Sequence, residues 1–326
     1  MNRLNIVITD KFPPDTTIEE RVLRPLDANL ILAQCRSEEE VIEAAHDADA
    51  LMVQWAPITR KVIERLTRCQ FISRYGIGLD MIDVQAAAEK GISVVNVPDY
   101  CIEEVAAHAL TFLLTSNRKL PYLNQSMHDG GWEPHDAIRP IQGLPGQTLS
   151  VIGVGRLGRR VAELATGLGM KILGYDILPH QSASHVKFVD LDTAVQEADY
   201  LSLHCPLTND TRHIINARVL AKMKPSAYLI NVARGRLVDT EALIEALSRG
   251  QIAGAALDVF EQEPLPGEHP LRKMTNVVLT PHLAWYSEQA LVAAQEKTAQ
   301  QVLHFFWNGR NNRNTSLELG QSSVIV

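Results

Sequence analysis

Three side chains that could carry acid–base chemistry stand in the second half of the chain, each shortly after an apolar run. They are Arg234, Glu263 and His282. An arginine can hold a carboxylate through two parallel hydrogen bonds and polarise a carbonyl group beside it. A histidine titrates near neutral pH and passes a proton in either direction. A glutamate that bonds to the imidazole favours the charged ring and holds its orientation.

These functions together are what the reduction of a 2-keto acid by a nicotinamide cofactor requires. The substrate carboxylate needs a cation, the developing alkoxide needs a proton, and the proton donor needs an acceptor that keeps it charged. Singly, an arginine, histidine or glutamate after a strand is more often a surface or structural residue. The prediction therefore rests on their joint placement at one edge of a sheet, where open α/β sheets bind ligands.

A glycine-rich turn follows the apolar run Leu149 to Ile152 and opens a helical stretch. It reads Gly153-Val154-Gly155-Arg156-Leu157-Gly158. The three glycines can turn the chain tightly, let the backbone approach a pyrophosphate and allow close packing of helix on strand, and the helix N-terminus favours negative charge. Asp176 follows 18 residues after the last glycine. A carboxylate there accepts hydrogen bonds from both ribose hydroxyls and repels a 2′-phosphate, so the predicted cofactor is NAD rather than NADP.

The elements that must position these residues alternate along the chain. In the first hundred residues, short apolar runs alternate with stretches of helical periodicity, which predicts a parallel sheet covered on both faces. From Ile102 to Leu120 the apolar residues keep helical register without Gly or Pro, which predicts one long helix leaving the first domain. The expected strands of this part are Leu4 to Ile8, Leu30 to Ala33, Ala50 to Val53, Phe71 to Ser73 and Ile92 to Val95.

A second alternating series begins after a loop rich in Gly and Pro from Asp129 to Gly146. Its six apolar runs predict one complete doubly wound sheet. Glu288 to Trp307 is again helical and is expected to end at Asn308 and Gly309. The polar stretch Arg310 to Ser323 is either a mobile tail or an arm packed on a neighbour. The expected strands are Leu149 to Ile152, Lys171 to Tyr175, Tyr200 to Leu203, Ala227 to Asn231, Ala253 to Leu257 and Val277 to Leu279.

Composition excludes several classes of protein. The 326 residues allow two domains, and the net charge of -7 without a basic run speaks against nucleic acid as a partner. The four cysteines lack metal-ligand spacing, so we expect reduced thiols in a cytoplasm and no bound metal; they are Cys35, Cys69, Cys101 and Cys205. The N-terminus lacks the pattern of a secretion signal, and no run approaches the ~18 apolar residues of a membrane span. We therefore expect neither secretion nor a membrane partner.

Several motifs resemble those of the NAD-dependent D-2-hydroxyacid dehydrogenases, and the resemblance extends from about Leu51 to about Phe306. These motifs are Arg74 to Asp80, Gly153 to Gly158, His204-Cys205-Pro206-Leu207-Thr208, Asn231 to Gly235, Asp258 to Pro264 and Pro281-His282. The resemblance implies an enzyme that interconverts a small 2-keto acid and its D-2-hydroxy acid with NAD(H), commonly as a homodimer. It implies Arg234, Glu263 and His282 as the catalytic set.

The resemblance also implies which residues bind substrate and cofactor. The loop Tyr75-Gly76-Ile77-Gly78 would present backbone N–H groups to the substrate carboxylate, which agrees with the use of glycine where a backbone must approach a ligand. Arg234 and His282 would also border the cofactor. Asp258, Val232 and Ala233 would line the nicotinamide, with Cys205, Pro206 and Thr211 near the adenosine half.

The same resemblance implies two α/β domains with parallel, doubly wound sheets. A flavodoxin-like substrate domain would comprise residues 1–101 and 289–326, and a Rossmann NAD domain, residues 102–288, would be inserted into it. The long helices at 102–120 and 288–307 would be the two crossings between them. Hinge closure of the domains would exclude water during hydride transfer.

Departures from the family bear on the substrate. Phosphoglycerate dehydrogenases usually carry Arg-Ser where this chain has Gln54-Trp55, and formate dehydrogenases use Gln in place of Glu263, so proton transfer is expected here. The segment Ala284 to Gln289 is similar to the C-terminal-binding proteins, corepressors in which the tryptophan that corresponds to Trp285 faces the substrate. Trp285 and Trp55 could form an apolar wall for a substrate side chain, or both could fill the cleft between the domains as structural residues.

Arg74 matches a substrate-contacting arginine of the corepressors, or forms a surface ion pair. Three hypotheses stay open: a D-2-hydroxyacid dehydrogenase, an NAD-dependent binding protein like the corepressors, and a 3-phosphoglycerate dehydrogenase without a regulatory domain. The compact chain favours the enzyme. The intact catalytic set does not separate the first two hypotheses, because the corepressors keep it.

Overall fold

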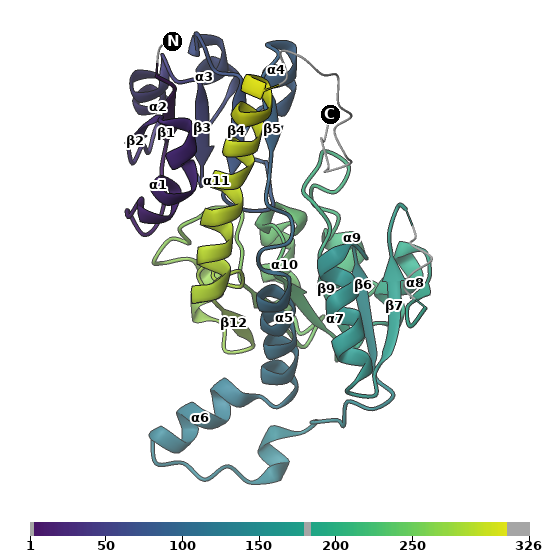
Figure 1. The fold of residues 1–326 in the computed structure, drawn as a ribbon. Coiled ribbons are helices and arrows are strands. Elements are labelled where there is room, and N and C mark those ends of the chain that lie inside the picture. The colour runs from purple at the N-terminus through teal and green to yellow at the C-terminus, as the bar shows by residue number, and fades with distance from the viewer. Residues whose placement is uncertain (1–2, 179–183, 312–326) are drawn as a thin grey trace. The chain divides into compact units, whose positions relative to one another are not determined.

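The computed structural model describes residues 3–178 and 184–311, which form two compact units (Figure 1). Unit 1 comprises Met1–Tyr100 and Ser287–Val326, and unit 2 comprises Cys101–Tyr286. The chain thus begins in unit 1, builds the whole of unit 2 and returns to unit 1. The expected C-terminal tail lies outside the described residues from position 312 onward.

Unit 1 is built on five parallel strands in the order β2-β1-β3-β4-β5. The order reverses between β1 and β3, as in flavodoxin-like sheets, so the predicted fold class is confirmed for this unit. β3 and β4 are buried along their whole length, which a parallel sheet covered on both faces requires. The strands are β1 (Asn5–Ile8), β2 (Asn29–Leu32), β3 (Ala50–Val53), β4 (Phe71–Arg74) and β5 (Ser93–Val95).

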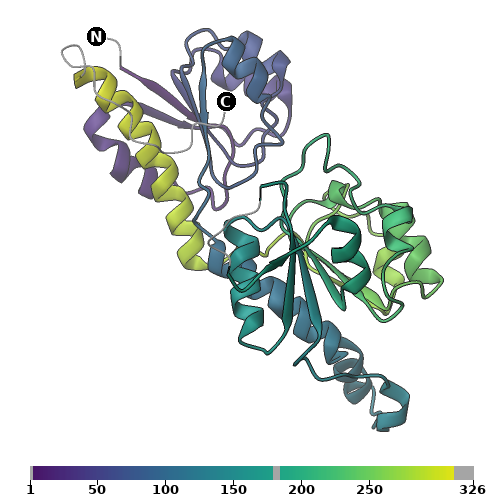
Figure 2. The same ribbon diagram turned by 90° about the vertical axis from the view of Figure 1, so that its right-hand side faces the viewer.

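Two layers of helices cover this sheet, and alternate strand residues face opposite layers. Ile6 and Ile8 pack in the core shared with α1 and α11, whereas Val7 packs in the core shared with α2, α3 and α4. Figure 2 shows α1 and α11 together on one side of the sheet. The helices of unit 1 are α1 (Thr17–Leu23), η1 (Arg24–Leu26), α2 (Glu38–Ala45), α3 (Arg60–Arg65), α4 (Val84–Glu89) and α11 (Glu288–Asn311).

Unit 2 carries seven parallel strands in the order β12-β11-β10-β9-β6-β7-β8. This is the doubly wound Rossmann order with one further strand at the edge, and the order reverses between β6 and β9. The predicted sheet of six strands lacked β8, because a strand of two residues shows no alternation of apolar and polar side chains. The strands are β6 (Thr148–Ile152), β7 (Lys171–Tyr175), β8 (Lys187–Phe188), β9 (Tyr200–Leu203), β10 (Tyr228–Asn231), β11 (Gly254–Leu257) and β12 (Val277–Leu279).

Helices cover both faces of this sheet as well. α8, α9 and α10 share one buried core with the strands, and α5 and α7 pack together against β10, β11 and β6. Asp190, Asn216 and Asp239 begin α8, α9 and α10 by accepting hydrogen bonds from backbone N–H groups of the first turn. The helices of unit 2 are α5 (Ile102–Asn117), α6 (Leu120–His128), η2 (His135–Ile138), α7 (Arg156–Thr166), α8 (Leu191–Glu197), α9 (Ala217–Leu220), η3 (Gly235–Leu237), α10 (Thr240–Ser248) and η4 (Pro270–Lys273).

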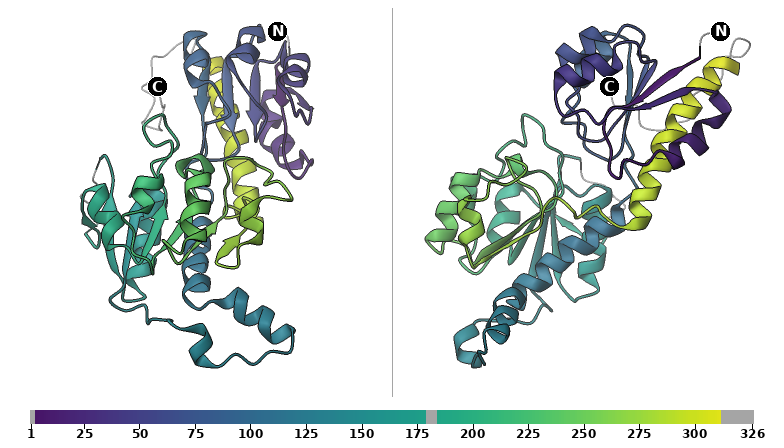
Figure 3. Two further views of the ribbon diagram at one scale, coloured as in Figure 1. Left: turned by 180° about the vertical axis from the view of Figure 1, so that it is seen from behind. Right: turned by 90° about the vertical axis from the view of Figure 1, so that its left-hand side faces the viewer.

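Two of the expected helices end elsewhere. The single helix expected to Leu120 ends at Asn117, because Lys119 takes a left-handed conformation (φ 50°) and a proline in the first turn starts α6. Figure 3 shows α6 and the chain after it projecting from unit 2 as an arm, residues 119–142. The C-terminal helix runs past the expected cap at Asn308 and Gly309 to Asn311, since glycine also tolerates helical geometry. Within the described ranges, no helix has the length and apolar character needed to cross a bilayer.

Candidate active site

His282 and Glu263 form a hydrogen-bonded pair in unit 2. The Nδ1 of His282 lies 2.6 Å from Oε2 of Glu263, and the other carboxylate oxygen accepts the backbone N–H of Phe260 at 2.9 Å. Burial raises the pKa of Glu263, but the hydrogen bond and charge of His282, the Phe260 N–H and the charge of Arg234 outweigh burial and lower that pKa below its usual range. Glu263 is therefore an ionised acceptor that holds the proton of His282 on Nδ1.

Asp258 fixes the turn that presents His282. The backbone N–H of His282, which has a left-handed conformation (φ 55°), donates to the carbonyl oxygen of Asp258 at 2.7 Å. The Asp258 carboxylate is buried and accepts from the Thr280 hydroxyl at 2.5 Å and from the N–H groups of Leu283 and Ala284, each at 2.9 Å. Asp258 was predicted to line the nicotinamide, and in the structure its side chain is hydrogen-bonded to the turn that carries His282.

Arg234 follows β10 on a loop that packs against the segment carrying Glu263. A Cβ atom added to Gly235 would lie 1.9 Å from the carbonyl carbon of Phe260, so only glycine allows this close approach. Asn231, 1% exposed, bridges the loop by donating to the Arg234 carbonyl at 2.9 Å and accepting from the Ala233 N–H at 3.1 Å. The loop Val232–Arg234 is therefore rigidly set beside Glu263, whose ionisation the Arg234 charge favours.

The glycine-rich turn lies between β6 and α7, at the point where the strand order of unit 2 reverses. Gly153 has φ 90°, and a Cβ atom there would lie 2.4 Å from the Cys205 backbone nitrogen. At Gly158, a Cβ atom would lie 2.0 Å from the Gly153 carbonyl oxygen. Gly155 differs, because a Cβ atom there meets nothing within 4 Å. Protein packing therefore explains the first and third glycines, while the space beside the second, just before Arg156 and Leu157, fits a bound pyrophosphate.

Asp176 follows β7 and reaches back to this turn. Its Oδ2 accepts the N–H of Val154 at 2.7 Å, and its Oδ1 accepts the N–H of Leu178 at 3.0 Å. The side chain is half-buried, so it remains within reach of a ligand. The Asp176 carboxylate thus lies directly beside the glycine-rich turn, and its contact with the ribose stays a prediction.

Cys205, Pro206 and Thr211 lie after β9, the strand beside β6. The Thr211 hydroxyl donates to the Pro206 carbonyl at 2.7 Å and so shapes the loop. Burial raises the pKa of Cys205 to about 11, so its thiol stays protonated. His204 precedes it, with Nε2 2.8 Å from the Ser202 hydroxyl, and burial lowers its pKa to about 4. His204 and Cys205 are therefore both uncharged at neutral pH, at the start of the loop where the sequence predicts the adenosine half.

Trp285 is hydrogen-bonded to the turn that carries His282. Its indole N–H donates to the His282 carbonyl at 2.9 Å, and its ring meets that of Tyr286 edge-on at 5.5 Å. The side chain is half-buried in unit 2. The contact fixes the indole relative to the histidine that precedes it by three residues.

The remaining predicted residues lie in unit 1, after β3 and β4. Trp55 is 49% exposed and Arg74 is buried, which speaks against a surface ion pair for the arginine. Gly76 has φ 149°, and a Cβ atom there would lie 1.6 Å from a guanidinium nitrogen of Arg74. The Asn96 side chain donates to the Ile77 carbonyl at 2.6 Å, and the Val97 N–H donates to the Gly76 carbonyl at 3.0 Å. The loop from Tyr75 to Gly78 is thus held in one shape.

Three supporting residues carried no signal in the sequence. His108, on α5, has Nε2 3.0 Å from the Thr280 hydroxyl and 3.9 Å from the Asp258 carboxylate. In unit 1, Glu19 accepts the Tyr75 hydroxyl at 2.9 Å and pairs with the Lys11 ammonium at 2.7 Å. Burial and the Glu19 charge raise the pKa of Tyr75 well above its usual range, which keeps the hydroxyl a donor. Such partners become visible only when the chain is folded, since they lie far from the site in sequence.

Comparisons with known proteins show the family of the chain. Residues 110–284, inside unit 2, match the family model described as "D-isomer specific 2-hydroxyacid dehydrogenase, NAD binding domain". A D-3-phosphoglycerate dehydrogenase of Synechocystis is 42% identical over 270 residues, which cover 82% of this chain and 48% of that protein. A hydroxypyruvate reductase of Thermotoga maritima is 38% identical over 293 residues, covering 89% of this chain and 94% of that protein.

Among solved structures, the D-lactate dehydrogenase of Aquifex aeolicus, complexed with NAD and lactic acid, superposes with a TM-score of 0.86 at 29% identity. The match covers 98% of this chain and 100% of that one. The chain spans about half the length of the Synechocystis relative, which is therefore the longer protein. With unit 2 as its NAD-binding domain, the chain belongs to the D-isomer specific 2-hydroxyacid dehydrogenase family.

Proposed function

We propose that the protein interconverts a 2-keto acid and its D-2-hydroxy acid with NAD(H), and that His282 is the acid–base catalyst. The observation that carries this proposal is the 2.6 Å hydrogen bond between His282 and Glu263, with the Arg234 loop packed on the same segment. An imidazole, an ionised carboxylate and a guanidinium are the groups that this reaction requires. They converge at the carboxyl ends of the strands of an NAD-binding domain.

In the reduction, NADH supplies the hydride that adds to the keto carbon. Arg234 binds the substrate carboxylate and polarises the adjacent carbonyl group. Because Glu263 occupies Nδ1 of His282, the opposite nitrogen, Nε2, gives its proton to the carbonyl oxygen as the hydride arrives. Glu263 stabilises the imidazolium before transfer, and the neutral ring takes a proton from the alcohol in the reverse direction. The backbone N–H groups of Gly76 to Gly78 would add hydrogen bonds to the carboxylate.

The residues of unit 2 fit NAD. The open space at Gly155 and the N-terminus of the 11-residue helix α7 suit a pyrophosphate, with Gly153, Arg156, Leu157 and Gly158 around it. Asp176 would exchange its bond to Val154 for the ribose hydroxyls and would repel a 2′-phosphate. Cys205, Pro206 and Thr211 would border the adenosine, and Val232, Ala233, Arg234, Asp258 and His282 would border the nicotinamide. Unit 1 would supply the substrate residues Trp55, Arg74 and the loop Tyr75 to Gly78.

The direct test is turnover of a keto-acid panel with NADH. We expect the purified chain to consume NADH, followed by its absorbance, with at least one of glyoxylate, hydroxypyruvate, pyruvate and phenylpyruvate. Absence of turnover with every compound, in a protein that still binds NADH, would sink the enzymatic proposal.

A 3-phosphoglycerate dehydrogenase is a second candidate, favoured by the identity with the Synechocystis relative. Against it stands Gln54-Trp55, where phosphoglycerate dehydrogenases usually carry Arg-Ser, because an amide and an indole then replace the phosphate-binding cation. On this reading 3-phosphoglycerate would compete with any keto acid that is turned over. We expect it to compete poorly, because the Lys11 ammonium, next to Phe12 on the loop that is hydrogen-bonded to Gln54, is buried against Glu19.

A binding protein like the corepressors is a third candidate, favoured by the segment Ala284 to Gln289 and by the indole of Trp285 held on the His282 carbonyl. On this reading NADH occupancy would change the oligomeric state, and no keto acid would be turned over. Light scattering with and without NADH, measured beside the turnover assay, separates this candidate from the enzyme.

We propose that the chain forms a homodimer through its arm. Helix α6 buries none of its residues, and its side chains Leu120, Tyr122 and Met127 are exposed, as is Trp132 after it. Arm residues also line a cavity of about 710 Å³ at the amino ends of the strands of unit 2, away from the glycine-rich turn. Apolar side chains gathered on a projecting segment suit a second copy of the chain.

A cytoplasmic location is also proposed. It rests on the four cysteines, all free thiols in the structure. Fractionation of the source cells would test it.

A further inference from the structure

Two aromatic side chains stand exposed at the carboxyl ends of neighbouring strands in unit 1. Phe12 follows β1 and is 58% exposed, and Trp55 follows β3 and is 49% exposed. β1 and β3 pair directly, and the strand order reverses between them. Ligands of open α/β sheets bind beyond the carboxyl ends of strands at such a reversal. The two aromatic residues therefore stand where this half of the fold presents a ligand site.

The backbone of both aromatic residues is held by buried side chains from the opposite strand. The Phe12 N–H donates to Oε1 of Gln54 at 2.7 Å, and the Trp55 N–H donates to Oδ2 of Asp10 at 2.6 Å. Gln54 and Asp10 are 5% and 7% exposed. These reciprocal hydrogen bonds join the two strand ends, so the exposure of the rings belongs to an ordered structure rather than a loose loop.

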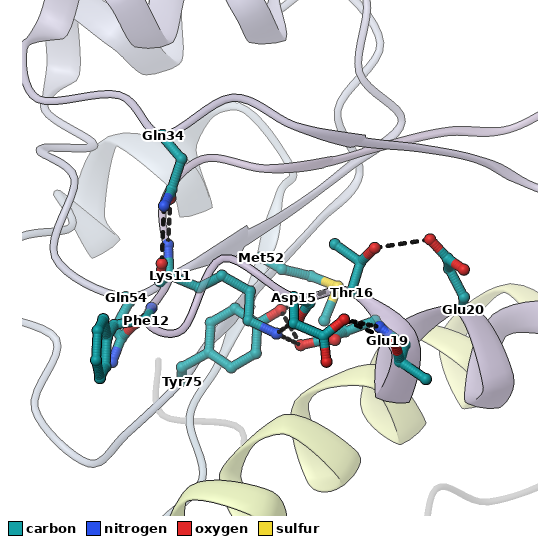
Figure 4. A network of polar contacts seen from close by, with 11 residues as sticks. Lys11, Phe12, Asp15, Thr16, Glu19, Glu20, Gln34, Met52, Gln54 and Tyr75 are labelled. Carbon is teal, nitrogen blue, oxygen red and sulfur yellow. Dashed lines mark hydrogen bonds and ion pairs between the residues drawn. The ribbon is translucent and has the colours of Figure 1, made fainter.

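The neighbouring cation is withdrawn from this surface. The ammonium of Lys11 is 1% exposed and pairs with Glu19 at 2.7 Å, while the Lys11 backbone N–H and carbonyl both bond to the Gln34 amide. Figure 4 shows the Lys11 side chain extending toward Asp15 and Glu19, with the Phe12 ring pointing away from them. The buried Lys11–Glu19 pair therefore anchors the loop after β1. The surface at Phe12 is aromatic, and the charge of Lys11 does not reach it.

We propose that Phe12 and Trp55 form the subsite for the substrate side chain, and that the preferred substrates are 2-keto acids with an aromatic or large apolar side chain. This inference rests on the proposed function, in which the loop after β4 binds the substrate carboxylate. β3 is one strand from β4 and β1 is two strands away, that is about 4.8 Å and about 9.6 Å across the sheet.

The length of the substrate side chain decides which keto acids could contact the two aromatic rings. Glyoxylate carries no side chain and contacts neither ring. A benzyl group reaches farther from the keto carbon than an isobutyl group. It would extend toward both rings and bury apolar surface on them, whereas an isobutyl group would reach Trp55 on the nearer strand. A phosphate or carboxylate on the side chain gains nothing there, because Lys11 is already paired and buried.

The test compares kcat/KM for phenylpyruvate and for glyoxylate with NADH in the full chain. We expect wild type to favour phenylpyruvate, and Phe12→Ala and Trp55→Ala each to lower the ratio of the two values by about tenfold, the effect of losing part of an apolar pocket. Trp307→Ala is the matched control, since Trp307 is an equally exposed (45%) tryptophan on α11, and its ratio should stay unchanged.

The outcomes separate the two levels of the proposal. Turnover of glyoxylate at least as efficient as that of phenylpyruvate in wild type, or a ratio unaffected in both aromatic variants, overturns the subsite and leaves the proposed function standing. Failure of wild type with every keto acid overturns the proposed function itself. Thermal unfolding of each variant identifies any loss of ratio that follows from misfolding, and Phe12→Leu, which keeps apolar bulk, should recover part of the phenylpyruvate preference.

Discussion

The surroundings of Glu263 determine whether its carboxylate is charged in the pair with His282. The hydrogen bonds from His282 and Phe260 and the charge of Arg234 lower its pKa despite burial. The carboxylate is therefore ionised throughout the range in which a histidine titrates, and it loses its charge only when the pH falls below the usual carboxyl range. We therefore expect the fall of kcat/KM at low pH to reflect the titration of groups other than Glu263.

The role of His282 can be tested by removing its ring. We expect His282→Ala to lower kcat by roughly 100-fold or more, because the alkoxide loses its proton donor. The dissociation constant for NADH, measured by fluorescence titration, should stay nearly unchanged. His304→Ala, at an exposed position of α11, is the control. Turnover that survives His282→Ala would contradict the acid–base role.

Asp176 is expected to set the choice between NADH and NADPH. Removing the carboxylate in Asp176→Ala takes away both the acceptor for the ribose hydroxyls and the repulsion of a 2′-phosphate. The ratio of kcat/KM for NADH over NADPH should fall about tenfold, which corresponds to roughly 1.4 kcal/mol. Asp192→Ala, on α8, serves as the control. An unchanged ratio in Asp176→Ala would mean that this carboxylate does not reach the ribose.

At the scale of elements, the site depends on how the ends of parallel strands are tied to one another. Asp258 after β11 bonds to the turn after β12, and Asn231 at the end of β10 bonds to the loop of Arg234. In unit 1, Asp10 and Gln54 join the ends of β1 and β3 in the same way. Buried acceptors thus turn adjacent loops into rigid supports, because an unpaired buried carboxylate or amide would be costly.

His204, at the end of β9, should make stability depend on pH. Its Nδ1 is buried without a hydrogen-bond partner in the described part of the chain, and its pKa falls from 6.5 to about 4. Between these values the unfolded chain binds a proton that the folded chain does not. Stability is then complete above about pH 6.5 and is lost as the pH falls toward 4, by up to about 3 kcal/mol.

Urea unfolding at several pH values between 4.5 and 7.5 measures this dependence. His204→Gln, which keeps a polar partner for Ser202, should flatten the decline by about one proton, whereas His304→Gln at an exposed position should not. His108 should add to the loss of stability at low pH in the same direction. Burial lowers its pKa, although the charge of Asp258 opposes this shift. An equal slope in wild type and His204→Gln would refute the assignment.

At the scale of the whole molecule, the arm at residues 119–142 is notable because its helix α6 buries no side chain against the rest of the chain. Lys119 takes a left-handed conformation between α5 and α6, its ammonium bonds to the carbonyl of Ile138, and none of α6 is buried. A helix of nine residues is marginal by itself in water. Packing against a second copy, as proposed above, would stabilise it.

Polar substitutions on the arm test the dimer. The double variant Met127→Ser and Trp132→Ser should move the mass measured by light scattering from two chains toward one, since the two side chains are 55% and 85% exposed and would be covered in a dimer. Trp307→Ser, an exposed aromatic residue of unit 1, should leave the mass unchanged. A wild-type protein that scatters as a single chain would exclude this interface.

The sequence alone determined the order of elements, the parallel sheets and the identity of the glycine-rich turn. Apolar runs, helical periodicity and glycine spacing can be recognised in the sequence. Each of them reflects contacts within a few residues or on one face of an element. The sequence did not predict the two-residue strand β8 or the break between α5 and α6, because neither feature interrupts such a pattern.

Only the tertiary structure decided which side chains act as supports. Asp258, which the sequence predicts to line the nicotinamide, holds the turn that carries His282. Lys11 pairs with Glu19 in the interior, so its charge does not lie on the surface beside Phe12. Glu19 stands 56 residues from Tyr75, which it bonds. Partners this far apart in sequence meet only when strands pair and helices pack, because burial sets the cost of leaving a polar group unpaired, and burial is a property of the fold.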